Sequence, residues 1–281
     1  MERDPKRDGG AGAAPTLAIL GAGKMGENLI RGWLAAETVD PARVLVTAGH
    51  QRRSRHLAES LEVEAVVGNR EAAARADIVL LCVKPQMAEV VLAQISDQLH
   101  EDQLLISVLA SVTTGYIERR LQRRVPVVRV MPNTPSRVRE GMSAVCGGQW
   151  AQEEHLERAE QLFAPLGRVL RIEEKHFDAV TGLSASGPAF LYVVIEALAE
   201  GGVKVGLPRA VATELAAQSC LGAARMVLET GSHPALLKDE VTTPAGCTVD
   251  GILRLEEGGL RVTLIKAIVE AQARASQLVQ E

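Results

Sequence analysis

The chain has 281 residues, 47% of them hydrophobic, and a formal net charge of −4 at pH 7. This length is sufficient for one large domain or for two ordinary ones, each with its own core. The negative charge and an aromatic content of only 2% argue against a surface that binds nucleic acid or anionic membranes, so we expect small molecules as partners.

The first fifteen residues and the four cysteines bear on the compartment. Residues 1–15 mix acids with bases and end in Gly, Ala and Pro, which predicts a disordered tail rather than a targeting peptide. The cysteines are far apart and show no spacing suited to a metal, so we predict reduced thiols and no metal site; they are Cys82, Cys146, Cys220 and Cys247. No uninterrupted apolar run approaches the roughly 20 residues of a membrane span. We therefore expect a cytoplasmic protein.

From Thr16 onward, short apolar runs alternate with helical patterns. The runs are TLAIL, RVLVT, EAVV, DIVLLCV and LLISVLA, and all but the short EAVV are dominated by Val, Ile and Leu. Strands of this composition are buried on both faces, as in a parallel sheet wound with helices. Three later β-like runs, VVRVM, MSAVCG and RVLRI, follow before the chain becomes helical. We predict an α/β, doubly wound Rossmann-type domain over residues 16–174.

A glycine-rich turn follows the first predicted strand. The segment GAGKMG contains Gly21, Ala22, Gly23, Lys24, Met25 and Gly26 at the mouth of a predicted helix. In such a turn the first glycine permits the tight bend, the second allows the backbone to approach a pyrophosphate, and the third lets the helix pack on the strand. The helix N-terminus favours the negative charge of the ligand. We therefore predict a dinucleotide site here, the alternative being merely a tight strand-to-helix turn.

The second predicted strand is followed by a segment that bears on the choice of cofactor. A site selective for NAD would place an acidic residue there for the ribose 2′-hydroxyl. This segment instead offers Thr47 and Ala48, then Arg52, Arg53 and Arg55, which favours a 2′-phosphate. We predict that NADPH is preferred and NADH possible. For any one of these arginines, an ordinary solvated helix face is the alternative.

The ends of the next two long strands should also border the cofactor, because ligands of open parallel sheets bind beyond the carboxyl ends of the strands. The residues predicted there are Val83, Lys84, Pro85, Ala110 and Ser111. Lys84 is also compatible with an exposed turn. The basic cluster ERRLQRRVPVVR, residues 118–129, is predicted to be a solvated helix face without a function of its own.

Residues 175–281 are predicted to form an all-α domain. The segment FLYVVIEALAEGGVKV, residues 190–205, is almost uniformly apolar, so we expect it to be buried on more than one side. A domain of this size cannot bury such a helix alone, which indicates a dimer whose partner completes the core.

The loop VTTPAGCTVDG, residues 241–251, interrupts two helical patterns. Pro244 ends the preceding helix, and Thr248 stands at the start of the next. A hydroxyl beside unpaired N–H groups at a helix N-terminus suits a small carboxylate next to a polar atom. The alternative is an ordinary threonine N-cap after a proline turn.

These motifs together resemble the pyrroline-5-carboxylate reductases, which catalyse the last step of proline biosynthesis. The resemblance runs from Leu17 to nearly the end of the chain and is carried by GAGKMG, VKP, MPNTPSRVREG, VTGLSASGPAF, GGVKVGLPR and LLKDEVTTPAGCTVDGILRLEEGG. It is nearest to the smaller cytosolic vertebrate form. The resemblance implies an amino-terminal domain that binds NAD(P)H, a helical domain that interlocks in a homodimer, and a decamer of five dimers.

The resemblance also implies roles for individual residues. Thr248 matches a catalytic threonine that hydrogen-bonds the ring nitrogen of the substrate, and Cys247 with Thr248 supplies backbone groups to its carboxylate. Glu174 matches a substrate-site glutamate and Asn69 an adenosine-side cofactor residue. Glu240 stands where relatives have an asparagine that contacts the nicotinamide. The chain departs from the family pattern at Glu240, at Cys247, where alanine or threonine is usual, and at PAG, where Pro-Gly-Gly is commoner.

Two other functions remain open from the residues alone. A 3-hydroxyacid dehydrogenase shares the two-domain plan but needs a base, a lysine on the long central helix, and residues 176–203 contain neither Lys nor Arg. A nicotinamide-sensing scaffold would keep the glycine turn but need not keep the loop around Thr248. Reduction of a cyclic imine requires no strong base, because the protonated imine is already an electrophile.

Overall fold

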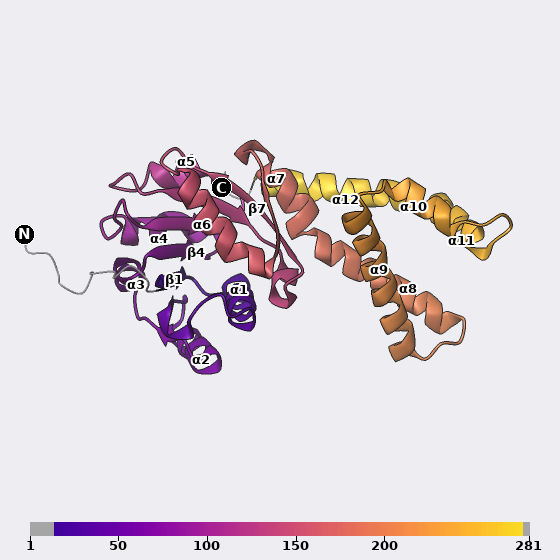
Figure 1. Ribbon diagram of the computed structural model, residues 1–281, viewed down its shortest axis with the longest axis horizontal. Helices are drawn as coiled ribbons and strands as arrows, with labels where there is room; N and C mark the ends of the chain where they lie inside the picture. Colours follow the sequence, from indigo (N-terminus) through magenta and orange to yellow (C-terminus); the bar gives the residue numbers. More distant parts are fainter. Residues whose placement is uncertain (1–13, 278–281) are drawn as a thin grey trace, which may run out of the picture. The chain divides into compact units, whose positions relative to one another are not determined.

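The computed structural model describes residues 14–277, which divide into two compact units. The first comprises residues 14–185 together with 272–277, and the second comprises Ser186–Ala271 (Figure 1). The predicted tail lies outside the described residues except for its last two, 14 and 15. The division between compact units falls at 185/186, whereas the sequence places its domain boundary at 174/175.

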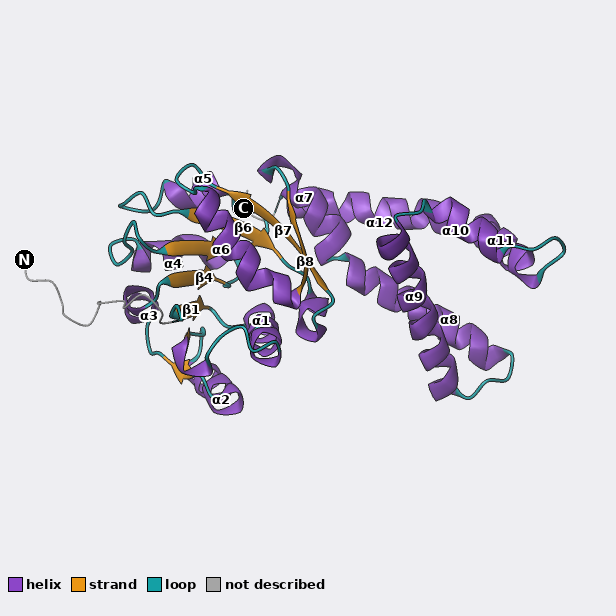
Figure 2. Cartoon of the chain, in the orientation of Figure 1, coloured by secondary structure: helices purple, strands orange, loops and turns teal. Residues whose placement is uncertain are grey.

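The first unit is built on one eight-stranded sheet (Figure 2). Its strands are β1 (Leu17–Leu20), β2 (Val44–Val46), β3 (Glu64–Ala65), β4 (Ile78–Leu81), β5 (Leu104–Ser107), β6 (Val127–Met131), β7 (Gly141–Gly147) and β8 (Gly167–Arg171). The spatial order is β3-β2-β1-β4-β5-β6-β7-β8, with β1 to β6 parallel and β7 antiparallel to β6. Chain order reverses between β1 and β4, which is the switch point of a doubly wound sheet. The predicted Rossmann-type fold is confirmed.

Helices cover both faces of this sheet. They are α1 (Lys24–Ala35), α2 (Gln51–Leu61), α3 (Asn69–Arg75), α4 (Ala88–Ile95), α5 (Thr114–Glu118), α6 (Glu153–Phe163) and α7 (Phe177–Val180), joined by short 3₁₀ turns. Because side chains of a strand alternate between faces, Leu17 and Ile19 pack with α1, α2 and α6, whereas Ala18 and Leu20 pack with α3, α4 and α5. All four side chains are at most 2% exposed, which explains why the strand reads as a continuous apolar run.

The basic cluster of residues 118–129 is solvated only in part: Arg119, Arg123 and Arg124 are exposed, as the sequence predicts, but they do not form a helix face. Helix α5 ends at Glu118, and Arg129 is the central residue of β6, where it is only 2% exposed. For Arg129 the prediction failed because its charge is compensated by Glu174, a residue far along the chain.

The second unit is entirely helical. Its helices are α8 (Gly187–Lys204), α9 (Arg209–Thr230), α10 (Pro234–Val241), α11 (Cys247–Glu257) and α12 (Leu260–Ala275), the last turn of α12 being counted with the first unit. Helices α8 and α9 pack against each other through small side chains, and the only residues of this unit in a buried cluster are Ala199, Ala212 and Ala216. This core is too small to stabilise five helices in water.

The apolar helix α8 is largely uncovered in the single chain. Leu191, Tyr192 and Val193 are 57%, 61% and 64% exposed. The expectation that residues 190–205 are buried on more than one side is therefore wrong for the isolated chain. An apolar surface of this extent marks a site of association.

One helical segment, Glu174–Lys204, is long and apolar enough by length and composition to cross a membrane. The sequence predicts no membrane-spanning stretch. This segment was missed because Thr, Ser and Gly residues interrupt its apolar run near 181–187. Only 11% of its apolar window is buried. A helix that a partner subunit covers meets the same criteria, so this feature alone is weak support for a membrane span.

Candidate dinucleotide site and substrate loop

The glycine turn after β1 has the geometry that its sequence predicts. Gly21 has a φ of +81°, and a Cβ there would lie 2.2 Å from Val83 Cγ1, so no other residue fits. A Cβ on Gly23 would meet nothing nearer than the Gly21 carbonyl oxygen at 3.9 Å, which leaves open space for a ligand. Gly26 brings α1 against the sheet, because its Cβ would lie 3.2 Å from Ile19 Cγ2.

The N-terminus of α1 is free to bind an anion. Its N-cap is Gly23, and no side chain caps the first turn. The N–H groups of that turn and the helix dipole together favour a phosphate. The residues of this turn therefore fit the pyrophosphate of a dinucleotide.

A cleft of about 660 Å³ opens beside the turn, at the carboxyl ends of β1, β2 and β4. Its lining includes eight of the predicted cofactor residues, namely Gly21, Ala22, Gly23, Thr47, Ala48, Asn69, Val83 and Lys84. Seven other predicted residues do not line it: Lys24, Met25, Gly26, Arg52, Pro85, Ala110 and Glu240. Of these, Gly26 acts through helix packing, and Ala110 packs against the cluster of Met131 and Phe177.

Sequence reasoning omitted seven of the sixteen residues that line the cleft. Arg53, which the sequence names with Arg52 and Arg55 as favouring a 2′-phosphate, does line it; the residues not predicted are Gly49, His50, Cys82, Met87, Val90, Val91 and Gln94. Gly49 and His50 directly follow the predicted β2 segment, so their place in the chain could have identified them. Val90, Val91 and Gln94 lie on α4, and no sequence signal distinguishes them from other residues of an amphipathic helix.

Thr47 lines the cleft, but its hydroxyl is engaged within the protein. Its Oγ1 accepts a hydrogen bond from the Gly21 N–H at 3.2 Å and donates to Asn69 Oδ1 at 2.6 Å. A hydroxyl has a single proton to donate, so Thr47 cannot also donate to a phosphate while this bond persists. Asn69 in turn donates to Gln94 Oε1 at 2.7 Å. Thr47 therefore positions the glycine turn, and Asn69 links it to α4.

A second hollow, of about 670 Å³, adjoins the start of α2. It is lined by His50, Arg52, Arg53 and His56, and it shares His50 and Arg53 with the dinucleotide cleft. Arg52 is exposed, and among residues 14–277 no ion pair or hydrogen bond engages its guanidinium. This hollow offers an uncompensated positive charge close to the end of β2.

Glu174 is held by residues of the sheet unit. Its carboxylate accepts hydrogen bonds from the N–H and the Oγ1 of Thr114, both at 2.8 Å, and from Arg129 Nη1 at 3.1 Å. The Arg129 guanidinium is buried beneath the Phe177 ring, 4.6 Å from its centroid, and its Nε and Nη2 have no hydrogen-bond partner among residues 14–277. Glu174 is thus the counter-charge of a buried arginine, a role that its sequence position does not reveal.

The same carboxylate affects a neighbouring thiol. Burial, together with the negative charge of Glu174, raises the pKa of Cys146 to about 12 despite the opposing charge of Arg129. Burial likewise raises the pKa of Cys82 to about 12. Both thiols are therefore protonated at neutral pH and poor nucleophiles.

The loop before α11 is a β-turn in which Gly246 N–H donates to the Thr243 carbonyl at 3.0 Å. Pro244 occupies the second position, and Ala245 the third, with a φ of +59°. Glycine is favoured at that third position, so alanine there costs about 1 kcal/mol of backbone strain. A side chain at Gly246 would be too close to its neighbour, because a Cβ there would lie 2.5 Å from Thr243 Oγ1.

Thr248 is the second residue of α11, and its hydroxyl is free. The N-cap of α11 is Gly246, so the interpretation of Thr248 as a helix cap is wrong. Within residues 14–277 no hydrogen bond engages the Thr248 side chain or the N–H groups of Cys247 and Thr248. This helix N-terminus therefore presents N–H donors and one hydroxyl together. Glu240 is exposed on α10.

The fold and the cleft define a nicotinamide-dinucleotide oxidoreductase of the Rossmann type. A family model described as "NADP oxidoreductase coenzyme F420-dependent" matches residues 16–111, and one described as "Pyrroline-5-carboxylate reductase dimerisation" matches residues 174–278. The pyrroline-5-carboxylate reductase of Glycine max is 42% identical over 263 residues, which cover 94% of this chain and 96% of the relative. That of Arabidopsis thaliana is 40% identical over 264 residues, which cover 94% and 95%.

Two solved structures that resemble this chain carry the same enzyme name as these relatives. The Plasmodium falciparum pyrroline carboxylate reductase with NADP bound matches with a TM-score of 0.86 at 29% identity, covering 94% of this chain and 98% of that one. A pyrroline-5-carboxylate reductase from Coxiella burnetii matches with a TM-score of 0.84 at 35% identity, covering 95% and 99%. The chain belongs to the pyrroline-5-carboxylate reductase family.

The role of Thr47 can be tested by removing its hydroxyl. Thr47→Val leaves the Gly21 N–H without its acceptor, so we expect NADPH and NADH to bind about five- to tenfold more weakly, by similar factors, in keeping with one lost hydrogen bond. Thr47→Ser should bind both cofactors almost normally. Fluorescence titration measures both affinities. A loss confined to NADPH would instead indicate a direct contact between Thr47 and the 2′-phosphate.

The role of Glu174 can be tested in the same way. Glu174→Gln removes the counter-charge of buried Arg129, so we expect a loss of roughly 3 kcal/mol in the free energy of unfolding, moderated because Glu174 is 27% exposed. Thr114→Val should lose about 1 kcal/mol. Urea unfolding at a fixed protein concentration measures the free energy of unfolding of both variants. A Glu174→Gln variant of unchanged stability but raised KM for the substrate would show that Glu174 is a substrate ligand.

Proposed function

We propose that this protein reduces L-1-pyrroline-5-carboxylate to L-proline with NAD(P)H, the last step of proline biosynthesis. The observation that carries this proposal is the uncommitted hydroxyl of Thr248 beside the uncapped N-terminus of α11, in a chain whose other unit contains a dinucleotide cleft. Membership of the family over 94% of the chain supports the same reaction.

The reduction of the imine requires few catalytic groups from the protein. The protonated ring imine is an electrophile, so positioning and the exclusion of water provide most of the acceleration. When bound, the reduced nicotinamide supplies the hydride that the imine carbon C5 accepts, which yields the secondary amine of proline. Thr248 Oγ1 holds the ring nitrogen, and the N–H groups of Cys247 and Thr248 hold the carboxylate. The glycine turn and the N-terminus of α1 hold the pyrophosphate.

NADPH is the preferred cofactor in this proposal, and NADH is possible. Two observations support the preference: residues 47–58, directly after β2, contain no acidic residue, and the Arg52 guanidinium, unpaired among residues 14–277, lines the hollow next to the cleft. An arginine recognises phosphate through several donors at once, which a 2′-hydroxyl cannot exploit to the same degree.

The working protein in this proposal is a homodimer formed through the helical unit, assembled further into a decamer of five dimers in the cytoplasm. The dimerisation family model over residues 174–278 and the exposed apolar side chains of α8 support the dimer. The decamer and the compartment rest on the resemblance to the smaller cytosolic form. The proposal includes neither a nucleic acid nor an anionic membrane surface as a partner, because the net charge is negative.

The reaction and the role of Thr248 are tested together. Wild-type protein mixed with NADPH and pyrroline-5-carboxylate should consume the reduced cofactor, whereas 3-hydroxy acids with NADP should not produce it. Thr248→Ala should lower kcat/KM about 10²-fold with little change in NADPH affinity or thermal midpoint. Thr248→Ser, which keeps the hydroxyl, should retain most activity. Full turnover by the alanine variant would remove Thr248 from the mechanism.

The preference for NADPH is tested at Arg52. Arg52→Ala removes a charge-assisted contact worth roughly 1.5–3 kcal/mol, so the ratio of kcat/KM for NADPH to that for NADH should fall at least tenfold. Arg55→Ala, which removes an exposed arginine of α2 that does not line either hollow, serves as the control. An unchanged ratio in Arg52→Ala would exclude it from the phosphate site.

The dimer is tested by charging the apolar face of α8. Leu191→Glu, at a side chain that is 57% exposed in the single chain, should produce monomers or aggregates because it places a carboxylate in the interface. Val67→Glu, at a 76% exposed position of the first unit, should leave assembly unchanged. Analytical ultracentrifugation separates the two results, and a stable, active wild-type monomer at nanomolar concentration would contradict the proposal.

A further inference from the structure

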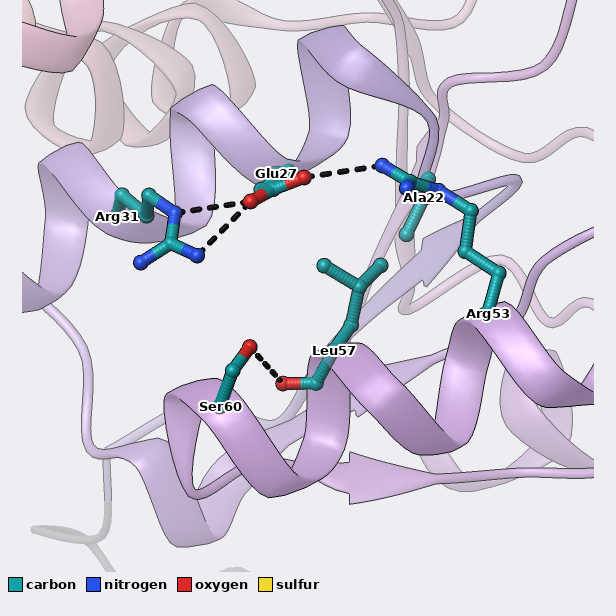
Figure 3. A network of polar contacts seen from close by, with 6 residues as sticks. All are labelled: Ala22, Glu27, Arg31, Arg53, Leu57 and Ser60. Atoms are coloured by element: carbon teal, nitrogen blue, oxygen red, sulfur yellow. Dashed lines mark hydrogen bonds and ion pairs between the residues drawn. The ribbon is translucent and has the colours of Figure 1, made fainter.

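The carboxylate of Glu27 binds two arginines, Arg31 and Arg53 (Figure 3), and Arg53 lines the dinucleotide cleft. Glu27 lies in the first turn of α1. Its Oε1 accepts hydrogen bonds from Arg31 Nε at 3.0 Å and Nη2 at 2.8 Å, and its Oε2 accepts one from Arg53 Nη2 at 2.9 Å. Arg53 comes from α2, so this contact joins the two helices that follow β1 and β2.

Arg53 is held in the cleft by the same arrangement. Its Nε donates to the Ala22 carbonyl at 3.3 Å, and both Arg53 and Ala22 line the cleft. Arg53 also lines the adjoining hollow with Arg52. The guanidinium therefore lies where the two hollows meet, with its orientation set by the backbone of the glycine turn and by Glu27.

The charge of Arg53 is compensated, unlike that of Arg52. Partial burial alone would raise the pKa of Glu27, but hydrogen bonds and charges from Arg31 and Arg53 keep that pKa below its usual value. Glu27 is therefore ionised at neutral pH, and its negative charge stands next to the guanidinium. A phosphate that enters the hollow meets the full charge of Arg52 but a neutralised Arg53.

We propose that Glu27 is a specificity-determining residue that limits selection for the 2′-phosphate and so keeps NADH usable. The inference rests on the proposed cofactor site. NADPH and NADH share the pyrophosphate and differ by the 2′-phosphate expected near Arg52 and Arg53, so the groups at that point, their charge included, set the selectivity. By cancelling the Arg53 charge, Glu27 reduces the advantage of NADPH without weakening the hydrogen bonds that orient Arg53.

The decisive variant is Glu27→Gln, because its amide oxygen can still accept from Arg53 Nη2 while the negative charge is lost. We expect the ratio of NADH to NADPH dissociation constants to rise about three- to tenfold, with a similar rise in the corresponding ratio of kcat/KM. The increase should shrink at high salt, since these charges are partly exposed. Adding Arg53→Ala to Glu27→Gln should abolish the increase.

Glu59→Gln is the matched control, since it makes the same change in net charge on an exposed residue of α2 that lines neither hollow. It should leave the ratio unchanged. Glu27→Ala provides a second test if the glutamine variant folds poorly. A ratio in folded Glu27→Gln that is unchanged or lower overturns this inference while the proposed reaction stands. Wild-type protein that binds neither cofactor would instead refute the cofactor site itself.

Discussion

The close approach of the β1–α1 turn to Val83, the second residue after β4, is the constraint on which the first unit depends. A side chain at position 21 would overlap Val83, since its Cβ would lie 2.2 Å from Val83 Cγ1. Because glycine removes that obstacle, the ends of β1 and β4 can meet at the switch point of the sheet. Thr47 then joins the end of β2 to the same turn through its hydroxyl. The dinucleotide cleft lies where these three strand ends converge.

Three arginines of this protein differ in the groups that surround their positive charge. A guanidinium keeps its proton under all ordinary conditions, so each must find a carboxylate, water or a ligand. Arg129 is buried against Glu174, and Arg53 shares the carboxylate of Glu27 with Arg31. Arg52 has no such partner in the part of the chain that is described. The position of the nearest carboxylate therefore decides whether the charge of each arginine is compensated within the protein.

In the helical unit, unlike in the sheet unit, small side chains are buried and many large apolar side chains are exposed. Its buried cluster consists of alanines, while larger apolar side chains such as Leu191 and Val193 remain exposed. The hydrophobic effect can stabilise this unit fully only when a second copy covers those side chains. Stability and assembly are then coupled, so the stability of the chain depends on its concentration.

The sequence by itself determined the strands, the glycine turn, the helical second half and the family, because apolar periodicity and turn residues are local signals. Only the tertiary structure decided how polar side chains are used. Thr47 bonds to Asn69, Glu27 to Arg53 and Arg129 to Glu174 only in the folded chain. No local sequence pattern predicts these pairs. The N-cap of α11 was likewise decided by backbone geometry, which assigned it to Gly246 and left the Thr248 hydroxyl free. Hydrogen-bond capacity is set by residue type, but its use is set by neighbours distant in sequence.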